Sequence, residues 1–279
     1  MEVQNKPAAM ARVPDPAAIR KTASAWRNGY KGPMKSPCKY VIAALVATFL
    51  PSAGPLARES CPVEAKLLLS TQARPKAIAS LGLTQETTGR IYLFDTDALD
   101  LSKQQVILRI RQGANNDLVV KVRKADGDRP SEASTFKGIS CEIDQTRTGA
   151  QTSYSVGRNY TAAQAPQTGN DIRKLLSAAQ RELLRKTGVS VEWDRVRRVA
   201  SIESSSWRSS ARSQFGKLAL ELWEWPQGEI LELSAKAGAE AGIAAYADLE
   251  RLAQMKGLAL SPSQDTKTST VLQTHPGSP

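Results

Sequence analysis

Residues 90–112, RIYLFDTDALDLSKQQVILRIRQ, and residues 117–124, DLVVKVRK, contain the pattern that decides the fold. In the second half of the first stretch and throughout the second, aliphatic and basic side chains alternate, which places them on opposite faces of an extended chain. The basic residues of this pattern are Arg109, Arg111, Lys121 and Arg123. The sequence therefore predicts two neighbouring strands, each with an aliphatic face that must be covered and a face that carries cations.

The same alternation continues on both sides of these two strands. Further strands are predicted over residues 61–69, 90–96, 139–146, 198–208, 217–225 and 229–236. The last two are joined by Trp225-Pro226-Gln227-Gly228, in which proline suits the second position of a turn and glycine the fourth. Eight strands without repeated βαβ units predict an α+β fold with a largely antiparallel sheet or a closed barrel.

Two helices, a loop and a tail complete the predicted domain. An apolar stripe predicts a helix over residues 170–188, and a second helix is expected over residues 239–255. Residues 149–169 are rich in Ser, Thr, Gln and Gly and predict a loop, whereas residues 258–279 predict a disordered polar tail. The domain is therefore expected to cover residues 61–257.

Seven of the predicted strands place charged residues on a single face. These residues are Glu64, Lys66, Arg109, Arg111, Lys121, Arg123, Glu142, Asp144, Glu203, Glu221, Glu232 and Lys236. A half-buried sheet with a solvated outer face has the same pattern, so periodicity alone leaves that interpretation open. The four cations on two strands adjacent in sequence favour a bound anion, because like charges directly opposite each other destabilise a strand pair.

The net charge and the histidine content narrow the possible chemistry. Residues 1–57 contain eight Lys/Arg and two Asp/Glu, so a formal charge of +5, out of +11, remains on residues 58–279. This mild excess suits an anionic ligand, and we expect no specific nucleic-acid partner. The one histidine, His275, lies in the predicted tail. Ser-His-Asp and Cys-His catalysis and histidine-rich metal sites are therefore disfavoured. Any catalysis or ligand binding is expected to depend on carboxylates, lysines and arginines.

Residues 34–57, MKSPCKYVIAALVATFLPSAGPLA, have the layout of a secretory signal peptide. Two lysines precede an apolar run, and small residues follow it. A retained membrane anchor is the alternative, although the apolar run is shorter than the roughly 20 residues that span a bilayer. We expect residues 1–57 to be an extension plus signal, the protein to be periplasmic or secreted, and membrane contact to occur only through this segment. Translation from Met34 rather than Met1 stays open.

Removal of the signal leaves Cys61 and Cys141. In an oxidising compartment an even pair of cysteines indicates a disulfide, and two buried thiols are the alternative.

The quoted stretches resemble the opening of CYTH domains, the triphosphate-tunnel family. In this sequence Glu64-Ala65-Lys66 precedes YLFDT (residues 92–96) and LRIR (residues 108–111), followed by a strand that ends in lysine. LALELWEWPQGEILELSAK (residues 218–236) resembles the closing hairpin of the family, and LLSAAQR (residues 175–181) is similar to a helix of many bacterial members. The resemblance implies an eight-stranded antiparallel tunnel with a charged interior and two or more packing helices.

The resemblance also implies a chemistry. Enzymes of this family hold triphosphate compounds with Arg and Lys, bind Mg²⁺ or Mn²⁺ with carboxylates, and use a metal-activated water to attack phosphorus. Carried over, the phosphate-binding residues are Lys66, Arg109, Arg111, Lys121, Arg123 and Lys236. The implied metal ligands are Glu64, Asp144, Glu221 and Glu232, and the implied catalytic carboxylates are Glu142 and Glu232.

One position departs from the family pattern. The first glutamate of the family's ExExK strand is replaced by Pro62, which removes one metal-facing carboxylate and one ladder N–H. Three functions therefore stay open. They are a metal-dependent hydrolase of inorganic triphosphate, polyphosphate or a related compound, a non-catalytic periplasmic tunnel that binds polyphosphate or another polyanion, and an interaction module with a merely solvated charged face. The sequence makes no prediction about the oligomeric state.

Overall fold

The structure is a computed structural model that describes residues 61–113, 116–124, 138–160, 172–210, 216–238 and 242–276. The predicted extension and signal over residues 1–57 lie outside these ranges, so export stays a prediction. No helix within the described ranges has the length and apolar character needed to cross a lipid bilayer.

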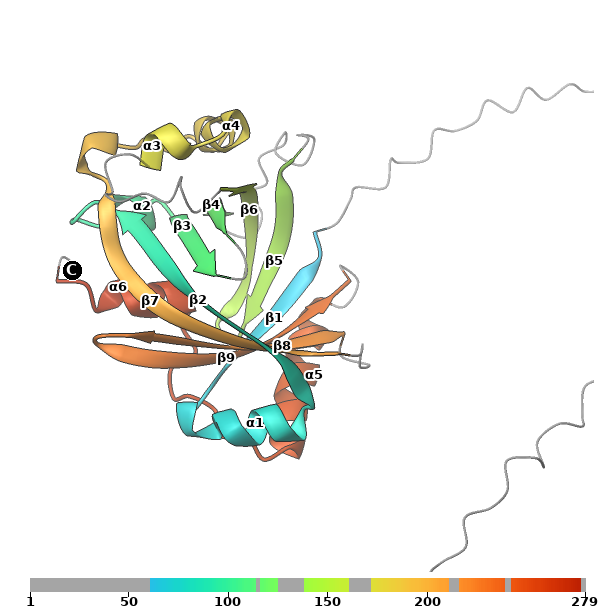
Figure 1. Ribbon diagram of the computed structural model, residues 1–279. Coiled ribbons are helices and arrows are strands. Elements are labelled where there is room, and N and C mark those ends of the chain that lie inside the picture. Colours follow the sequence, from blue (N-terminus) through green and yellow to red (C-terminus); the bar gives the residue numbers. More distant parts are fainter. Residues whose placement is uncertain are drawn as a thin grey trace, which may run out of the picture. The chain divides into compact units, whose positions relative to one another are not determined.

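Nine strands form a closed barrel (Figure 1). They are β1 (Val63–Leu69), β2 (Leu83–Asp95), β3 (Val106–Gly113), β4 (Asp117–Lys124), β5 (Ser140–Thr146), β6 (Gly149–Asn159), β7 (Arg197–Ser209), β8 (Lys217–Trp225) and β9 (Gly228–Ala237). Their order around the barrel is β1-β5-β6-β4-β3-β2-β7-β8-β9. Neighbouring strands are antiparallel except for β1 and β5, which run parallel and place Glu64 opposite Asp144. The predicted closure is confirmed, and the parallel pair makes the sheet mixed.

The prediction of eight strands is wrong, because β6 occupies the stretch that was expected to be a loop. This strand pairs with both β4 and β5. Tyr154 and Val156 belong to the apolar core outside the barrel, whereas Ser155 and Gly157 line its interior. The inner positions of this strand carry small residues, which leave room for the interior but remove the hydrophobic alternation that normally marks a strand.

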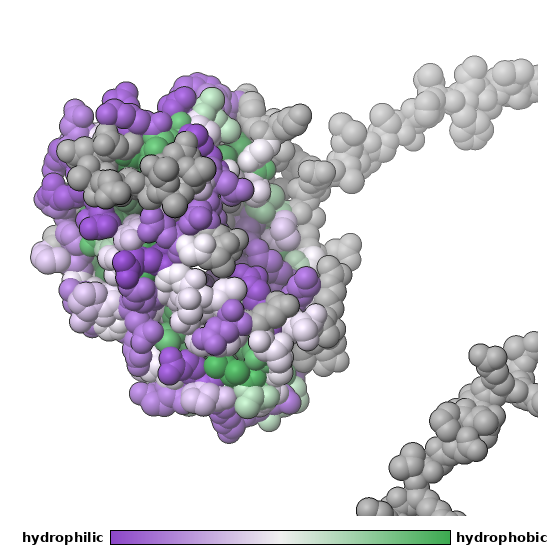
Figure 2. All heavy atoms as spheres, in the orientation of Figure 1, coloured by the Kyte–Doolittle hydropathy of each residue, from purple (hydrophilic) through white to green (hydrophobic). Residues whose placement is uncertain are grey.

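Helices cover the aliphatic outer face of the barrel in two places, and a further helix, α6 (Lys267–Gln273), packs at its inner face. The others are α1 (Arg74–Ser80), α2 (Asp100–Lys103), α3 (Ile172–Leu175), α4 (Ala178–Lys186) and α5 (Gly242–Met255), with two 3-10 helices, η2 (Thr71–Ala73) and η6 (Trp193–Arg195). In Figure 1, α1 and α5 lie against β1, β8 and β9, and their side chains share one core with these strands. A second core joins β3, β4 and β6 to α2, α3 and α4. Figure 2 shows a mostly hydrophilic face with small apolar patches, as expected when helices cover the outward aliphatic side chains.

The helix predicted over residues 170–188 is interrupted in the structure. It is divided into α3 and α4, and Ser177 caps α4 in a capping box with Gln180. The Gln180 side chain also donates hydrogen bonds to the carbonyls of Leu118 (2.8 Å) and Val156 (3.2 Å), which fixes α4 to the strands that it covers.

The prediction that residues 258–279 form a disordered tail is wrong for the described residues through 276. The Gln264 side chain accepts a hydrogen bond from the backbone N–H of Leu68 (3.0 Å) and donates one to its carbonyl (2.8 Å). Beyond this anchor, Val271 and Leu272 of α6 pack with Trp223 and other residues from the inner face of the barrel. The segment has few apolar residues, and its order depends on these non-local contacts rather than on its own propensity.

A disulfide joins Cys61 and Cys141, as predicted from the cysteine count. Their Cα atoms lie 5.3 Å apart and are separated by 80 residues in sequence. Cys61 immediately precedes β1 and Cys141 lies in β5, so the bond reinforces the parallel strand pair that completes the barrel.

Reduction of this disulfide should lower the free energy of unfolding by about 4 kcal/mol, the chain-entropy value for a loop of this length. Thermal unfolding with and without reductant measures the effect. The double variant Cys61→Ser/Cys141→Ser is the control, because its melting temperature should already be low and should not respond to reductant. Alkylation of either cysteine in native, non-reduced protein, detected by peptide mass mapping, would refute the bond.

Candidate functional site: a charged tunnel

The inner face of the barrel encloses a cavity of about 1180 Å³. The predicted site residues that line it are Glu64, Lys66, Arg109, Arg111, Lys121, Arg123, Glu142, Glu221, Glu232 and Lys236. Asp144 is buried directly behind this lining, in contact with Lys66. The structure therefore brings all of these side chains into one interior, and the alternative of a solvated outer face does not hold for them.

Glu203 belongs to the predicted charged face but lies on the outside. Its carboxylate accepts a hydrogen bond from Arg90 Nε (2.7 Å), and both side chains are more than half exposed. The tunnel side of β7 carries serines instead, and Ser204 donates to Glu221 (3.3 Å). The sequence analysis placed Glu203 on the wrong face of its strand because β7 lacks a clear alternation of apolar and polar residues.

Three carboxylates gather where β1 meets β5. We call Glu64, Glu142 and Asp144 the β1–β5 cluster, and their ligand oxygens lie within 4.8 Å of one another. The Lys66 ammonium lies among them, 2.9 Å from Glu64, 3.8 Å from Glu142 and in direct contact with Asp144. Lys121 contacts Asp144 (2.8 Å) and Glu142 (3.3 Å). Three carboxylates therefore face these two lysines, and a third lysine lies at the exposed rim.

That third lysine is Lys236, whose ammonium lies 3.1 Å from Glu142 and 3.8 Å from Glu64. Its side chain is 67% exposed, so its ion pairs are weakened by solvent and stabilise the fold much less than those of Lys66.

The pKa values follow from this arrangement. Burial would raise the pKa of Asp144, but Lys66 and Lys121 outweigh burial and hold it below its ordinary value. Burial would lower the pKa of Lys66, but the surrounding carboxylates raise it. Burial and the neighbouring Lys66 lower the pKa of Lys121, although it also contacts carboxylates. Asp144 and Lys66 are therefore both charged at neutral pH.

A separate pair of carboxylates lies on the opposite hairpin. Glu221 of β8 and Glu232 of β9 are cross-strand partners, which we call the β8–β9 pair. Lys267 of α6 contacts Glu221 directly, and its ammonium lies 2.9 Å from Glu232 and 4.7 Å from the centre of the Trp223 ring. Burial would raise the pKa of Glu221, but Lys267 lowers it to about 2. The four predicted metal ligands therefore divide into two groups, and each group already contacts a lysine.

The arginines of β3 differ from each other in their partners. Arg111 binds Asp117 through two hydrogen bonds, one of them 2.8 Å long from Nε to Oδ1. The guanidinium of Arg109 forms no ion pair within 4.0 Å of any described residue, and its buried Nε has no hydrogen-bond partner there. Burial and the neighbouring Arg111 both lower the pKa of Arg109. Arg109 is thus a half-buried cation that lines the cavity, and its Nε has no hydrogen-bond partner among the described residues.

The strand register keeps the four predicted cations from lying directly opposite one another. Arg109 lies opposite Val119, and Lys121 lies opposite Ile107. Lys121 and Arg123 consequently reach toward β5, whereas Arg109 and Arg111 face another part of the interior.

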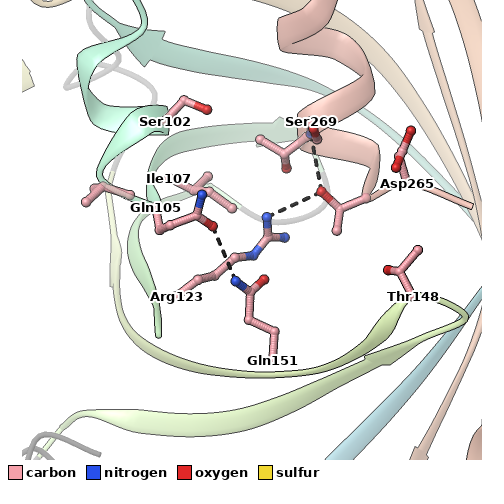
Figure 3. Close-up of a pocket in the computed structure, with 11 residues that line it drawn as sticks. Ser102, Gln105, Ile107, Arg123, Thr148, Gln151, Asp265 and Ser269 are labelled. Carbon is pink, nitrogen blue, oxygen red and sulfur yellow. Dashed lines mark hydrogen bonds between the residues drawn. The ribbon is translucent and has the colours of Figure 1, made fainter. Parts of the chain in front are cut away.

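A smaller polar pocket of about 190 Å³ adjoins the tunnel beside α6 (Figure 3). Arg123 lines both cavities, and its Nη1 donates to Thr266 Oγ1 (3.3 Å) while its Nε lies 3.9 Å from Asp144. Figure 3 shows the Arg123 side chain extending toward the N-terminal cap of α6, with Gln105 and Gln151 hydrogen-bonded beside it (3.3 Å). Arg123, one of the predicted phosphate-binding residues, therefore hydrogen-bonds to the N-terminal cap of α6 as well as lining the tunnel.

Asp117 and Lys267 are among the charged lining residues that the sequence analysis missed. Asp117 lies two alternation steps before Lys121 on the same face of β4, so the strand pattern could have placed it on the inner face. Lys267 could not be placed in this way, because nothing local to the polar C-terminal segment indicates that it enters a barrel. The spacing of Thr268, Val271 and Leu272 on one helical face is the only signal that the segment offers.

The two acidic groups differ in how well they suit a divalent cation. The β1–β5 cluster offers three hard oxygen donors close enough together to share one ion, so its donor set fits Mg²⁺ or Mn²⁺. Pro62 adds no carboxylate, and its carbonyl accepts the N–H of Ile143 (2.8 Å). Lysines contact both groups, so the number of carboxylates distinguishes them. The β8–β9 pair fits less well, because it offers two carboxylates rather than three and the buried Lys267 ammonium contacts both of them.

No family model and no curated protein sequence matches this chain. Among solved structures, the chain is similar to a Hippeastrum protein, a candidate adenylyl cyclase with a dominant triphosphatase activity (19% identity, TM-score 0.55, covering 75% of this chain and 94% of that one). It is also similar to a candidate adenylate cyclase from Bacillus halodurans (16% identity, TM-score 0.51, covering 76% and 97%). Likeness at such low identity concerns the fold. The chain has the closed-tunnel, CYTH-like fold that the resemblance in residues 90–124 predicted.

Proposed function

We propose that the tunnel binds a linear phosphate compound, such as inorganic triphosphate or short polyphosphate, and hydrolyses it with the help of Mg²⁺ or Mn²⁺. The observation that carries this proposal is Arg109, which lines a cavity of about 1180 Å³ and forms no ion pair or Nε hydrogen bond with any described residue. Removing a cation from water without a counter-ion is costly, and a phosphate oxygen would supply charge-assisted hydrogen bonds to the half-buried Arg109. The triphosphatase activity of the Hippeastrum protein supports the choice of substrate class.

We assign the following roles in phosphate binding and hydrolysis to the residues of the tunnel. Arg109 binds and orients a phosphate group, and Arg111, held by Asp117, adds positive charge beside it. Lys66 and Lys121 neutralise charge on the opposite side of the interior. A cation held by Glu64 and Asp144, with Glu142 beside it, would polarise a phosphoryl oxygen and activate a water.

Glu142 is the carboxylate best placed to accept a proton from an attacking water. Its side chain is 22% exposed and lines the cavity, whereas Asp144 is 2% exposed and lies behind the lining. Glu232, the other carboxylate that the resemblance implies for catalysis, contacts Lys267 instead. We therefore assign the general-base role to Glu142 in this proposal.

A non-catalytic, exported tunnel that only binds polyphosphate is the second candidate. The observation that favours it is the set of ammonium groups of Lys66, Lys121 and Lys236, whose three positive charges contact the three carboxylates of the β1–β5 cluster and can balance them without a metal. The proline in place of the family's first glutamate points the same way.

Phosphate release from tripolyphosphate decides between the two candidates. The described domain should release phosphate when Mg²⁺ or Mn²⁺ is present and stop when EDTA is added. Glu142→Gln should lower the rate by roughly 100-fold or more, because a positioned general base contributes that much. Glu203→Gln, on the outer surface, is the matched control and should leave the rate unchanged. Binding without release under every cation tested would instead establish the non-catalytic candidate.

A further inference from the structure

The C-terminal segment places one lysine, Lys267, in the tunnel and holds it in a fixed position. Gln264 ties the segment to the backbone of Leu68, and Val271 and Leu272 anchor α6 in an apolar cluster at the inner face of the barrel. Trp225 Nε1 also donates to Thr274 at the end of α6 (3.0 Å). Lys267 lies between these anchors, so its position is set by the packing on both sides of it.

The surroundings of the Lys267 ammonium are those of a bound cation. The side chain is 9% exposed, and its ammonium contacts one carboxylate from each strand of the β8–β9 pair. The face of the Trp223 ring, which attracts positive charge, lies 4.7 Å away.

We propose that Lys267 is a tethered cation that takes the place of a metal ion at Glu221 and Glu232, and thereby confines divalent-cation binding in the tunnel to the β1–β5 cluster. The inference deepens the proposed function and rests on it for the metal at that cluster. A divalent ion could bind the β8–β9 pair only by displacing Lys267, which would leave a buried ammonium without a partner. The number of bound divalent ions is thus set by a residue of the C-terminal segment.

The test is a titration of the folded protein with Mn²⁺ alone, with free Mn²⁺ followed by electron paramagnetic resonance. Lys267→Met keeps the length and apolar stem of the side chain and removes its charge. We expect this variant to bind one more Mn²⁺ than the wild type, and Lys267→Met/Glu221→Gln/Glu232→Gln to lose the additional site. Lys217→Met is the matched control, because Lys217 lines the same cavity and is exposed at the end of β8. An unchanged stoichiometry in folded Lys267→Met would overturn the proposal.

A second measurement covers the case in which Lys267→Met does not fold. Glu232→Gln in the presence of Lys267 should leave both the number of Mn²⁺ ions and their affinity unchanged, because Lys267 and not a metal contacts Glu232. A tenfold loss of Mn²⁺ affinity in this variant would show that Glu232 is a metal ligand and would refute the proposal. The test is independent of catalysis: if the wild type binds no Mn²⁺ and Lys267→Met binds one, the proposed metal site at the β1–β5 cluster fails, whereas the replacement of a metal by Lys267 at Glu221 and Glu232 stands.

Discussion

Replacing Asp144 with Asn should lower the free energy of unfolding by about 3 kcal/mol at pH 7, because it breaks a buried ion pair from one side. Asp144 is 2% exposed and compensates the ammonium groups of Lys66 and Lys121. The expected loss lies at the low end of the range for such changes, since both lysines keep a contact with Glu142. Thermal unfolding should show a decrease of roughly 6–12 °C for a domain of this size.

The matched control is Glu203→Gln, which removes one partner of an exposed ion pair with Arg90. That change should cost less than about 1 kcal/mol. Equal melting temperatures for Asp144→Asn and Glu203→Gln would contradict the ion-pair network that the structure shows in the tunnel.

The dependence on pH gives the same prediction a second readout. The folded-state pKa of Asp144 is held below 3.8, so the stability that it contributes is complete above the pKa of the unfolded chain and disappears as the pH falls below it. The difference in the free energy of unfolding between the wild type and Asp144→Asn should therefore be constant from pH 7 to about pH 5 and become smaller below pH 4. Glu221, whose pKa is lowered to about 2, loses its contribution in the same direction in both proteins.

Much of the fold could be predicted because each strand of a closed barrel has one face toward the interior and one toward the outside. Residues of two kinds therefore alternate along the strand. In β3 and β4 one face touches the helix-covered core and the other the tunnel, so aliphatic and charged residues alternate along the chain. The hairpin of β8 and β9 was equally clear, and its strand limits agree with the prediction to within one residue. In β6 the inner positions are Ser153, Ser155 and Gly157, so the pattern that marks a strand is missing there.

The pairing of charges could not be predicted, because it depends on contacts between segments far apart in sequence. Alternation places Arg109 and Lys121 on the charged face of their strands, but only the barrel's closure at β1 and β5 brings Lys121 to Asp144 and leaves Arg109 without an ion pair among the described residues. Lys267 enters the tunnel from a segment whose composition indicates no structure, and its position depends on Gln264 and on the apolar residues of α6. Local patterns identify which residues face inward, whereas the register and the C-terminal anchor determine their roles.

The second large effect concerns the anion itself. Tripolyphosphate should stabilise the folded protein, because a ligand that binds only the native state contributes about 2.7 kcal/mol at a hundredfold excess over Kd. This corresponds to an increase in melting temperature of roughly 5–11 °C. Arg109→Met should abolish most of that increase without lowering the stability of the free protein much, since Arg109 has no partner to lose among the described residues. Sulfate at matched ionic strength is the control for a non-specific salt effect.

Calorimetric titration of tripolyphosphate into the wild type and into Arg109→Met tests the tunnel site most directly. The control variant is Arg90→Met, which removes an arginine from the outer surface. We predict saturable binding to the wild type and to Arg90→Met, and an affinity lower by roughly 10-fold to 100-fold for Arg109→Met, as expected for the loss of hydrogen bonds to a charged group. Equal affinities for the wild type and Arg109→Met, or no saturable binding to the wild type, would contradict a phosphate-binding tunnel.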